Sequence, residues 1–355
     1  MTSGTDQSPE RFPSTIGAKA LDVERLRALL VESGEPAFRA KQVIRWLYGR
    51  RAHSWDEMTD LPAALRESLS QRLALPCPET IRRQVSEDGT RKYLFRLGDG
   101  TTVEAVGLPT ADRLTVCFST QAGCAMGCSF CATGASGFTR DLGPGEMVDQ
   151  VTTIAEDFGH RVTNAVAMGQ GEPFANYDAT LAALRIMNSA DGPGIGARHL
   201  TVSTCGLTPG IRRFASEPEQ FTLAVSLHSA VQSTRDTLMP GVRAMPLQQL
   251  RAELESYIAR TGRRPSLEYA LVLGVNDTGA ELSALIDFCR GMLVHVNLIP
   301  VNPVDGLGHE RTTLARANEF ADALRRNGTE ASIRSERGAD IDAACGQLRQ
   351  REAAD

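Results

Sequence analysis

The apolar positions that follow residue 143 fall into two alternating patterns. In some segments apolar residues recur every three or four positions, as on one face of a helix, and in others they form short runs typical of buried strands. The helical pattern covers 143–158, 177–189, 246–261, 279–292 and 314–327, and the strand pattern covers 162–168, 199–204, 221–227, 267–273, 295–300 and 330–334. Regular alternation of strand and helix builds a parallel sheet that closes wholly or partly into a barrel. With about six such units, the sequence predicts an α/β fold with an incomplete (βα)6 barrel.

The chain before this region divides into two differently patterned parts. Residues 21–73 carry apolar residues at helical spacing, whereas 91–118 hold short alternating segments separated by glycine turns, which is typical of a β meander. Pro76-Cys77-Pro78 is the expected boundary between them. The predicted organisation is a disordered N-terminus at 1–15, a helical accessory domain at 16–76, a β meander or linker with a β-hairpin extension at 77–113, the barrel with a C-terminal cysteine loop at 114–349, and a tail at 350–355.

Composition limits the partners and the compartment. The 355 residues carry a formal net charge of −5, which weakens any global electrostatic attraction to nucleic acid. No apolar run is long enough to cross a bilayer, and the polar segment at 1–14 has no signal-peptide pattern. We therefore expect a cytoplasmic protein without a membrane partner. In a reducing compartment its eight cysteines are more often metal ligands or catalysts than disulfide partners.

One local cluster of basic residues contrasts with the negative net charge of the chain. It lies in the middle of the N-terminal helical part and comprises Arg39, Lys41, Arg45, Arg50 and Arg51. A solvated helix face and contact with RNA phosphates explain this cluster equally well on the pattern alone.

The strongest chemical signal is the spacing Cys-x3-Cys-x2-Cys formed by Cys124, Cys128 and Cys131. Thiolates this close in a loop are typical ligands of one metal centre. A structural zinc site needs four protein ligands, and an ordinary four-iron cluster is held by four cysteines. Three cysteines leave one iron open, and the spacing resembles that of the radical S-adenosylmethionine (SAM) superfamily, in which SAM binds that iron. A zinc knuckle with a distant fourth ligand is the alternative.

Polar or glycine-rich motifs follow several predicted strands at the same end. They are Met168-Gly-Gln-Gly-Glu172-Pro173, Ser203-Thr-Cys-Gly, Ser226-Leu-His228 and Asn297-Leu-Ile-Pro-Val-Asn302-Pro. Each motif is weak by itself, because a strand terminus or a capped turn explains it as well. Since the carboxyl ends of parallel strands gather at one face of a barrel, their recurrence predicts a pocket for SAM above the cluster.

A lone cysteine near the C-terminus is the second unusual feature. Cys345 lies in Arg337-Gly-Ala-Asp-Ile-Asp-Ala-Ala-Cys345-Gly-Gln-Leu. A reactive cysteine needs an accessible, electropositive setting, which Arg334 and Arg337 would supply. A buried or merely tolerated cysteine is the alternative. Cys77, Cys205 and Cys289 carry no functional prediction; Cys289 fits an apolar helical pattern and is expected to pack.

Taken together, these motifs resemble the RlmN/Cfr family of radical SAM RNA methyltransferases. The resemblance rests on Cys117 seven residues ahead of the cluster loop, Gly-Phe-Thr-Arg-Asp-Leu after it, Gly-x-Gly-Glu-Pro, Ser-Thr-Cys-Gly, Ser-Leu-His, Asn-Leu-Ile-Pro-x-Asn-Pro and Asp-Ile-Asp-Ala-Ala-Cys-Gly-Gln-Leu. It runs from about residue 21 to 348 and implies a radical SAM barrel. It also implies that the N-terminal helical part contacts RNA.

The resemblance implies a two-SAM mechanism for methylating an adenine carbon. Cys345 would take a methyl group from one SAM, and a [4Fe-4S] cluster on Cys124, Cys128 and Cys131 would cleave a second SAM reductively. The methyl carbon on Cys345 would then add to the adenine, and Cys117 would deprotonate the adduct and form a disulfide with Cys345. Glu104 matches an acidic position assigned as a proton acceptor and competes with Cys117 for that role. The implied SAM contacts are Gly171, Glu172, Ser203, Ser226, Leu227, His228 and Asn302.

The implied substrates are adenine 2503 of 23S rRNA and, for the housekeeping branch, adenine 37 of certain tRNAs. A reductant such as flavodoxin or ferredoxin is implied as a partner, and we expect a monomer. Gln170 departs from the family pattern, which usually has methionine there. Pro173 and the Gly-Phe-Thr-Arg segment favour methylation at C2 over C8. The alternatives are C8 methylation, another RNA target, a non-catalytic RNA-binding protein with a structural cluster, and a radical SAM activase.

Overall fold

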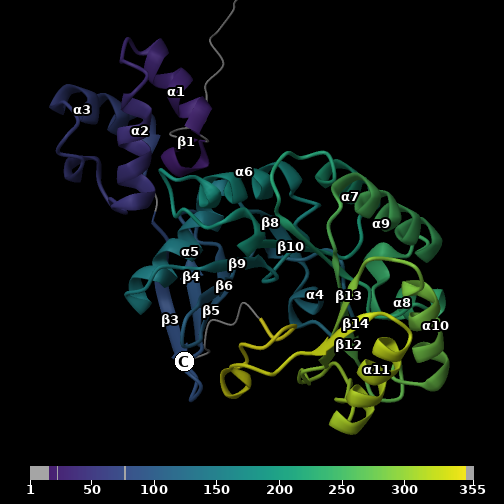
Figure 1. Ribbon diagram of the computed structural model, residues 1–355. Helices are drawn as coiled ribbons and strands as arrows, with labels where there is room; N and C mark the ends of the chain where they lie inside the picture. The colour runs from purple at the N-terminus through teal and green to yellow at the C-terminus, as the bar shows by residue number, and fades with distance from the viewer. Residues whose placement is uncertain (1–15, 22, 76, 349–355) are drawn as a thin grey trace, which may run out of the picture.

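A computed structural model describes residues 16–21, 23–75 and 77–348 (Figure 1). The expected disordered N-terminus at 1–15 and the expected tail at 350–355 lie outside the described residues. Within the described part of the chain, a ten-stranded sheet has the order β14-β13-β12-β11-β10-β9-β6-β5-β4-β3. Strands β6 and β9 to β14 are paired in parallel, and β3 to β5 extend the sheet beyond β6 by antiparallel pairing.

The parallel strands and the helices between them alternate in the chain. The strands are β6 (Leu114–Cys117), β9 (Asn164–Ala167), β10 (Leu200–Thr204), β11 (Thr222–Ser226), β12 (Ser266–Leu271), β13 (His295–Pro300) and β14 (Glu330–Ile333). The helices are α5 (Pro144–Phe158), α6 (Tyr177–Asn188), α7 (Thr208–Phe214), α8 (Gln232–Leu238), α9 (Leu247–Thr261), α10 (Gly279–Cys289) and α11 (Leu314–Arg326). The helices surround the sheet on its outer side (Figure 1). Each of the six connections from β6 to β14 contains at least one helix, so the predicted α/β fold with an incomplete barrel of six βα units is confirmed.

Helix α5 shows how the sequence defines these elements. Its apolar positions Met147, Val148, Val151 and Ile154 are buried, which places one face against the sheet. The Glu146 carboxylate accepts the Gly143 N–H at 2.8 Å and caps the first turn. The helix ends where Gly159 adopts a left-handed conformation with φ 64°, which favours glycine.

The antiparallel extension and the C-terminal segment lie beside the open side of the barrel. The extension consists of β3 (Glu79–Val85), β4 (Arg91–Arg96) and β5 (Thr102–Pro109). After β14 the chain turns toward this extension and crosses the space between them (Figure 1). There Ala343 and Leu348 pack with Val106 of β5 and Cys117 of β6 in one apolar cluster. The C-terminal segment therefore runs from the edge strand β14 to the region of β5 and β6.

The cluster loop lies between β6 and α5. It contains a small hairpin of β7 (Gln121–Gly123) and β8 (Phe138–Asp141) and a short helix α4 (Ala132–Ser136). A Cβ atom at Gly123, where φ is +77°, would come within 2.0 Å of the Gly137 carbonyl oxygen, so the hairpin requires glycine here.

The N-terminal part is helical and packs on α5 (Figure 1). Its helices are α1 (Val23–Glu32), α2 (Arg39–Ile44) and α3 (Ala63–Arg72), and two short strands, β1 (Ile16–Gly17) and β2 (Leu73–Ala74), pair with each other in parallel. Where one domain ends and the next begins stays a prediction. Among the described residues, none of the helices has the length and apolar character that crossing a membrane requires.

Candidate functional site

A cavity of about 650 Å³ opens at the carboxyl ends of the parallel strands. Its size lies within the range of about 300–1,000 Å³ that is usual for small-molecule sites. The cavity wall includes most of the predicted site residues: Cys117, Cys124, Cys128, Cys131, Gly171, Glu172, Ser203, Ser226, His228, Asn302 and Cys345. Two predicted residues, Glu104 and Leu227, are not part of this wall.

The loop that carries Cys124, Cys128 and Cys131 is bound by its neighbours on two sides. On one side the Ser129 N–H donates to the Leu238 carbonyl of α8, and the Gly241 N–H donates to the Met126 carbonyl, both at 2.9 Å. On the other side the Ala132 N–H donates to the Gly346 carbonyl at 2.7 Å. The loop is therefore fixed between α8 and the C-terminal segment.

The three cysteines of this loop face one cavity and influence one another. Burial, assisted by the neighbouring Cys128 and Cys131, raises the pKa of Cys124 to about 12, so the three thiols are close enough to interact. No three His, Cys, Asp or Glu side chains among the described residues converge on a single metal ion. Three thiols on one wall suit a multi-iron cluster, because each of them binds a different iron.

The Gly-Gln-Gly-Glu turn after β9 brings its backbone against the cluster hairpin. At Gly171, where φ is +103°, an added Cβ would lie 2.6 Å from the Gln121 side chain, so only glycine fits. Glu172 is 1% exposed, and its carboxylate accepts the N–H of Phe174 at 2.9 Å and that of Cys205 at 2.6 Å. Burial raises the pKa of Glu172, whereas these hydrogen bonds act to lower it. The turn thus holds a single acidic side chain at the cavity wall.

Gln170, the residue that departs from the family pattern, is buried and is not part of the cavity wall. Its side chain is 1% exposed, and its Oε1 has no hydrogen-bond partner among the described residues. Its backbone accepts the Thr120 N–H at 2.8 Å and donates to the Ser119 hydroxyl at 2.8 Å. Gln170 therefore supports the turn from behind.

His228 and Leu227, which follow β11, face different environments. The His228 Nδ1 accepts the Ala270 N–H at 2.9 Å, and the ring packs edge-on against Phe130 at a centroid distance of 4.7 Å. Burial, assisted by the charge of Arg235, lowers the pKa of His228 to about 3, so the imidazole is neutral near pH 7 with Nε2 as a donor. Leu227 is 0% exposed and its side chain belongs to the apolar core, so a contact of this residue with SAM stays a prediction.

Asn302 connects β13 to the C-terminal segment. Its Nδ2 donates to the Cys345 carbonyl at 3.1 Å, and its Oδ1 accepts from Arg311 at 2.7 Å. The amide is therefore used within the protein and orients the backbone of Cys345.

Two thiols outside the cluster loop share the same cavity. Cys117 ends β6 and Cys345 lies in the C-terminal segment, and both are free thiols. Burial raises the pKa of Cys117 to about 12, the neighbouring Cys345 adds to this effect, and Arg334 opposes it. Arg334, which follows β14, also lines the cavity. The structure thus brings together two thiols and a guanidinium that are far apart in the sequence.

Glu104 lies behind this group. It is 4% exposed on β5, and its carboxylate is 3.6 Å from the Lys92 amino group. Lys92 in turn donates to the Asp342 carbonyl in the C-terminal segment at 3.2 Å. Glu104 does not line the cavity, and its role as a proton acceptor stays a prediction.

Some residues of the cavity wall were not predicted. Glu268 of β12 accepts from Ser266 and Asn297, both at 2.7 Å, and Cys205 and Arg311 also line the wall. Glu268 had a signal, since a carboxylate inside an otherwise apolar strand is uncommon. Cys205 lies inside the strand-end motif Ser203-Thr-Cys-Gly, although no function was predicted for its thiol. Arg311 had no signal, because nothing in its spacing differs from that of ordinary loop residues.

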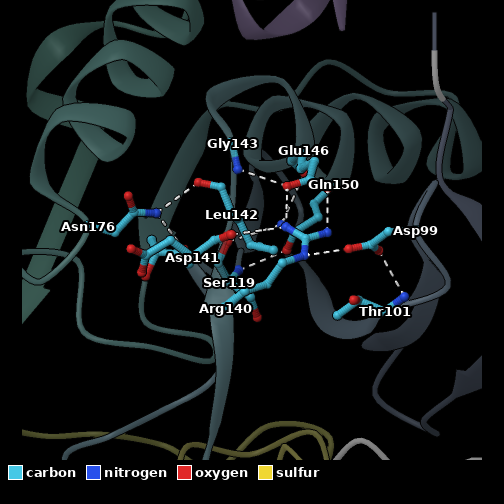
Figure 2. A network of polar contacts seen from close by, with 11 residues as sticks. Asp99, Thr101, Ser119, Arg140, Asp141, Leu142, Gly143, Glu146, Gln150 and Asn176 are labelled. Carbon is cyan, nitrogen blue, oxygen red and sulfur yellow. Dashed lines mark hydrogen bonds and ion pairs between the residues drawn. The ribbon is translucent and has the colours of Figure 1, made fainter. Parts of the chain in front are cut away.

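Arg140 fixes the cluster hairpin to the rest of the barrel (Figure 2). From β8 its guanidinium donates to Asp99 in the turn between β4 and β5 at 2.7 Å and to Glu146 of α5 at 2.8 Å. Asn176 holds the same hairpin from the other side by donating to the Leu142 carbonyl at 2.8 Å. These bonds fix the direction in which the cluster loop leaves the sheet.

Comparison with known proteins agrees with this arrangement. Residues 19–75 match the ribosomal RNA large subunit methyltransferase N-terminal domain, and residues 118–277 match the radical SAM superfamily. A protein of Synechococcus elongatus named probable dual-specificity RNA methyltransferase RlmN is 48% identical over 330 residues, which cover 91% of each chain. The protein of that name from Gloeobacter violaceus is 46% identical over 92% of this chain and 93% of its own.

A solved structure gives the same result for the fold. The crystal structure of a radical SAM methyltransferase from Sphaerobacter thermophilus superposes with a TM-score of 0.90 at 45% identity, covering 95% of this chain and 100% of that one. The barrel, its cysteine loop and these matches define a radical SAM enzyme. Within that class, the chain belongs to the RlmN family.

The family implies a [4Fe-4S] cluster and SAM, and the residues present fit both groups. Three thiols on one cavity wall suit an iron–sulfur cluster. Buried N–H groups of Arg235, which lies next to this wall, lack an acceptor among the described residues and suit a nearby anionic group. Gly171 and Glu172 both line the cavity, and the buried carboxylate of Glu172 suits the ammonium of SAM.

Proposed function

We propose that the protein is a radical SAM methyltransferase that transfers a methyl group to C2 of an adenine in RNA through an S-methylcysteine intermediate, with two SAM per turnover. One observation carries this proposal: Cys117 and Cys345 share a single cavity with Cys124, Cys128 and Cys131. A protein that only held a structural cluster, or an activase that acted on a protein glycine, would need neither additional thiol. The names of the relatives supply RNA as the substrate class.

The residues have separate roles in this proposal. Cys124, Cys128 and Cys131 hold the cluster, while the polar groups at the strand ends, among them Glu172 and His228, bind SAM. When bound, the cluster and SAM supply a 5′-deoxyadenosyl radical by one-electron cleavage. The Cys345 sulfur takes a methyl group from another SAM as the methyl–sulfonium bond breaks, which gives S-methylcysteine and S-adenosylhomocysteine.

The second half of the reaction releases the product from Cys345. After a hydrogen atom leaves the S-methyl group, its carbon bonds to C2 of the adenine. Cys117 takes the C2 proton, and the adduct gives up one electron, which the oxidised cluster would accept. The Cys117 sulfur then bonds to the Cys345 sulfur, the bond between the methylene carbon and the Cys345 sulfur breaks with its electron pair staying on carbon, and that carbon takes up the proton from Cys117 to become the methyl group. Cys117 suits the role of proton acceptor better than Glu104, because Cys117 lines the cavity and Glu104 lies behind it against Lys92.

The position of the RNA is proposed from the N-terminal helices and the family to which they belong. Lys41, Arg45 and Arg50 have exposed side chains, and Arg50 stacks over Trp46 at 4.3 Å. Arg51, in contrast, faces α5, where it bonds to the Thr152 carbonyl at 3.3 Å. We therefore assign RNA contact to the first three of these residues and a docking role to Arg51. The substrates are adenine 2503 of 23S rRNA and adenine 37 of tRNA, and we expect a monomer that receives electrons from flavodoxin or ferredoxin.

Anaerobic turnover with SAM and a chemical reductant tests this function. Purified 23S rRNA and tRNA that lack the modification are digested after reaction, and the nucleosides are separated by mass spectrometry. The wild type is expected to form 2-methyladenosine, and Cys345→Ala is expected to lower its yield at least a thousandfold, because the methyl carrier is lost. Cys77→Ala, which removes a half-buried thiol outside the cavity, is the matched control.

The possible products separate the competing functions. Formation of 8-methyladenosine would move the reaction to C8 of the ring. Release of 5′-deoxyadenosine without any methyladenosine would mean that the RNA target is wrong. A protein that binds the cluster but does not cleave SAM would be a structural iron–sulfur protein.

A further inference from the structure

Arg235 of α8 has an unusual position. It is the largest fully buried side chain in the described part of the protein, with 0% exposure. Its Nη2 donates to the Cys205 carbonyl at 2.6 Å and lies 3.5 Å from the Ser226 carbonyl. Its Nε and Nη1 are buried without any acceptor in the described residues. A buried cation with unsatisfied N–H groups is unfavourable unless a counter-charge or acceptor compensates it, so a partner outside the polypeptide is indicated.

The surroundings of Arg235 show where this partner lies. Leu238, the last residue of α8, and Gly241, which follows this helix, both form backbone hydrogen bonds with the cluster loop. Cys128 and Cys205 pack in the same apolar cluster as Leu238. Burial lowers the pKa of Arg235, and the nearby Cys205 and Cys128 oppose this effect. The guanidinium therefore lies on the Cys128 side of the cluster loop.

Direct contact with SAM does not explain the unsatisfied groups. Cys205 and Ser226 line the cavity, whereas Arg235 lies one layer behind them and has no exposed surface. The layer between Arg235 and the cavity is thin at Gly206, where φ is +95°. An added Cβ at Gly206 would lie 3.1 Å from Arg235 Nη2, so a larger residue would crowd the guanidinium. The glycine thus leaves room for the Arg235 guanidinium between the cavity wall and the backbone of α8.

We propose that Arg235 is a positioning residue that stabilises the reduced form of the iron–sulfur cluster held by Cys124, Cys128 and Cys131. The inference rests on the cluster assignment made under the proposed function. A four-iron cluster with three thiolates is anionic, and one-electron reduction makes it more negative. A fixed buried cation favours the more negative state, and N–H groups directed at cluster or cysteine sulfur have the same effect. Arg235 thereby makes it easier for a weak one-electron donor to reduce the cluster.

The test compares cluster reduction in variants that keep or remove the charge. Arg235→Met and Arg235→Gln are neutral, and Arg235→Lys keeps the charge. Arg263→Met is the matched control, because Arg263 also has a buried nitrogen without a described acceptor but lies over the Tyr257 ring, outside the cavity wall. Each protein is reconstituted anaerobically, its iron and sulfide are counted, and the reduced cluster is followed by electron paramagnetic resonance during a dithionite titration with redox mediators.

The neutral variants are expected to lower the ratio of reduced to oxidised cluster at fixed potential on the order of tenfold, which equals about 59 mV for a one-electron couple. Arg235→Lys is expected to stay near the wild type, and Arg263→Met to equal it. Unchanged midpoint potentials in both neutral variants, or an equal shift in Arg263→Met, would overturn the proposal.

A measurement on the cluster-free protein distinguishes this role from a purely structural one. If Arg235 stabilises the cluster, its charge has no counter-charge in the cluster-free protein. Arg235→Met should then leave the melting temperature of the cluster-free protein unchanged or raise it. Loss of stability without a change of potential would show that Arg235 only supports the fold. A wild type that takes up neither iron nor sulfide would instead refute the cluster assignment, and the inference with it.

Discussion

At the scale of single residues, Arg140 links parts of the chain that the sequence separates widely. Asp99 lies in the turn between β4 and β5, and Glu146 lies in the first turn of α5, yet both carboxylates bond to one guanidinium (Figure 2). Because Arg140 belongs to the hairpin that carries the cluster loop, these ion pairs affect the position of Cys124 as well as stability. The Arg140 hydrogen bond holds the pKa of Asp99 at about 2, against the effect of burial.

The lowered pKa of Asp99 predicts that the folded protein loses stability in acid. In the unfolded chain Asp99 titrates near its ordinary pKa of about 4, so its contribution is complete above that value and is lost as the pH falls toward 2. Since the Asp99 side chain is 49% exposed, screening limits the contribution to about 1 kcal/mol or less. Urea unfolding of the wild type should therefore lose more stability from about pH 5 to about pH 2 than unfolding of Asp99→Asn. Asp112→Asn, in an exposed turn, should follow the wild type; parallel curves for Asp99→Asn would refute this coupling.

The sequence predicted those site residues that belong to continuous motifs. The structure places Gly171, Glu172 and His228 on the cavity wall, although their roles remain predictions. Leu227 belongs to the same motif as His228 and yet faces the core, because neighbouring residues of an extended segment point to opposite sides. Arg235 was not predicted, since its burial depends on the thin layer at Gly206, which only the folded chain shows.

At the scale of elements, the turn between β3 and β4 holds the C-terminal segment that carries Cys345. The Asp88 carboxylate pairs with Arg337 at 2.8 Å and accepts the Gly338 N–H at 3.3 Å. Nearby, the Ser86 hydroxyl donates to Asp340 at 2.6 Å. The antiparallel extension therefore acts as a support for the C-terminal segment, outside the six βα units.

Removing this support should expose Cys345. Asp88→Ala deletes an ion pair and a hydrogen bond to the C-terminal segment, and a hydrogen bond from the Thr90 N–H within the turn. The two contacts to the segment are worth about 1–2 kcal/mol together, so its local opening should become roughly tenfold more frequent. Alkylation of Cys345 by iodoacetamide, followed by peptide mass spectrometry, should accelerate by a similar factor, while methyl transfer decreases. Asp112→Ala is the control on an exposed turn of the same extension. An unchanged alkylation rate would mean that other contacts, such as that between Asn302 and Cys345, hold the segment alone.

Elements with a clear apolar pattern were predicted, and polar ones were missed. Strand β13 has the predicted bounds, and α5, α9 and α11 differ from the prediction by one residue at one end. Strand β3 was missed because its side chains are largely exposed at the sheet edge, which gives no alternation of apolar and polar residues. Helix α8, with the sequence QSTRDTL, has one aliphatic residue and presents no apolar face to a pattern search.

At the scale of the whole molecule, the N-terminal helical part docks on the outer face of α5. The buried Lys19 amino group pairs with the buried Asp149 carboxylate, and the Tyr48 hydroxyl donates to the Lys19 carbonyl at 3.2 Å. Gly145 allows this approach, because an added Cβ would lie 2.6 Å from Lys19. The sequence predicted a helical part here but not the surface on which it packs, since the interface depends on single contacts without periodicity. The docking fixes Lys41, Arg45 and Arg50 relative to the cavity.

The Lys19–Asp149 pair allows this docking to be tested by a double-mutant cycle. Burial raises the pKa of Asp149 to about 6, and Lys19 opposes the shift, so removing Lys19 leaves a carboxylate that is costly to ionise. Lys19→Met should lower the free energy of unfolding by about 3–5 kcal/mol at pH 8, the loss typical of breaking a buried pair.

The double variant Lys19→Met/Asp149→Leu should recover most of this loss, because apolar residues of similar volume replace the pair. As the pH falls from 8 toward 6, the deficit of Lys19→Met should also shrink, because without the Lys19 charge the pKa of Asp149 lies above about 6, so the carboxyl takes up a proton in this range and becomes less costly to bury. Urea unfolding of the four proteins at both pH values measures these differences. If Lys19→Met and the double variant lose the same free energy of unfolding, apolar packing alone docks the N-terminal part. If the predicted coupling holds, Lys19→Met should also weaken RNA binding, whereas the double variant restores it, because the basic helices depend on this contact for their position on α5.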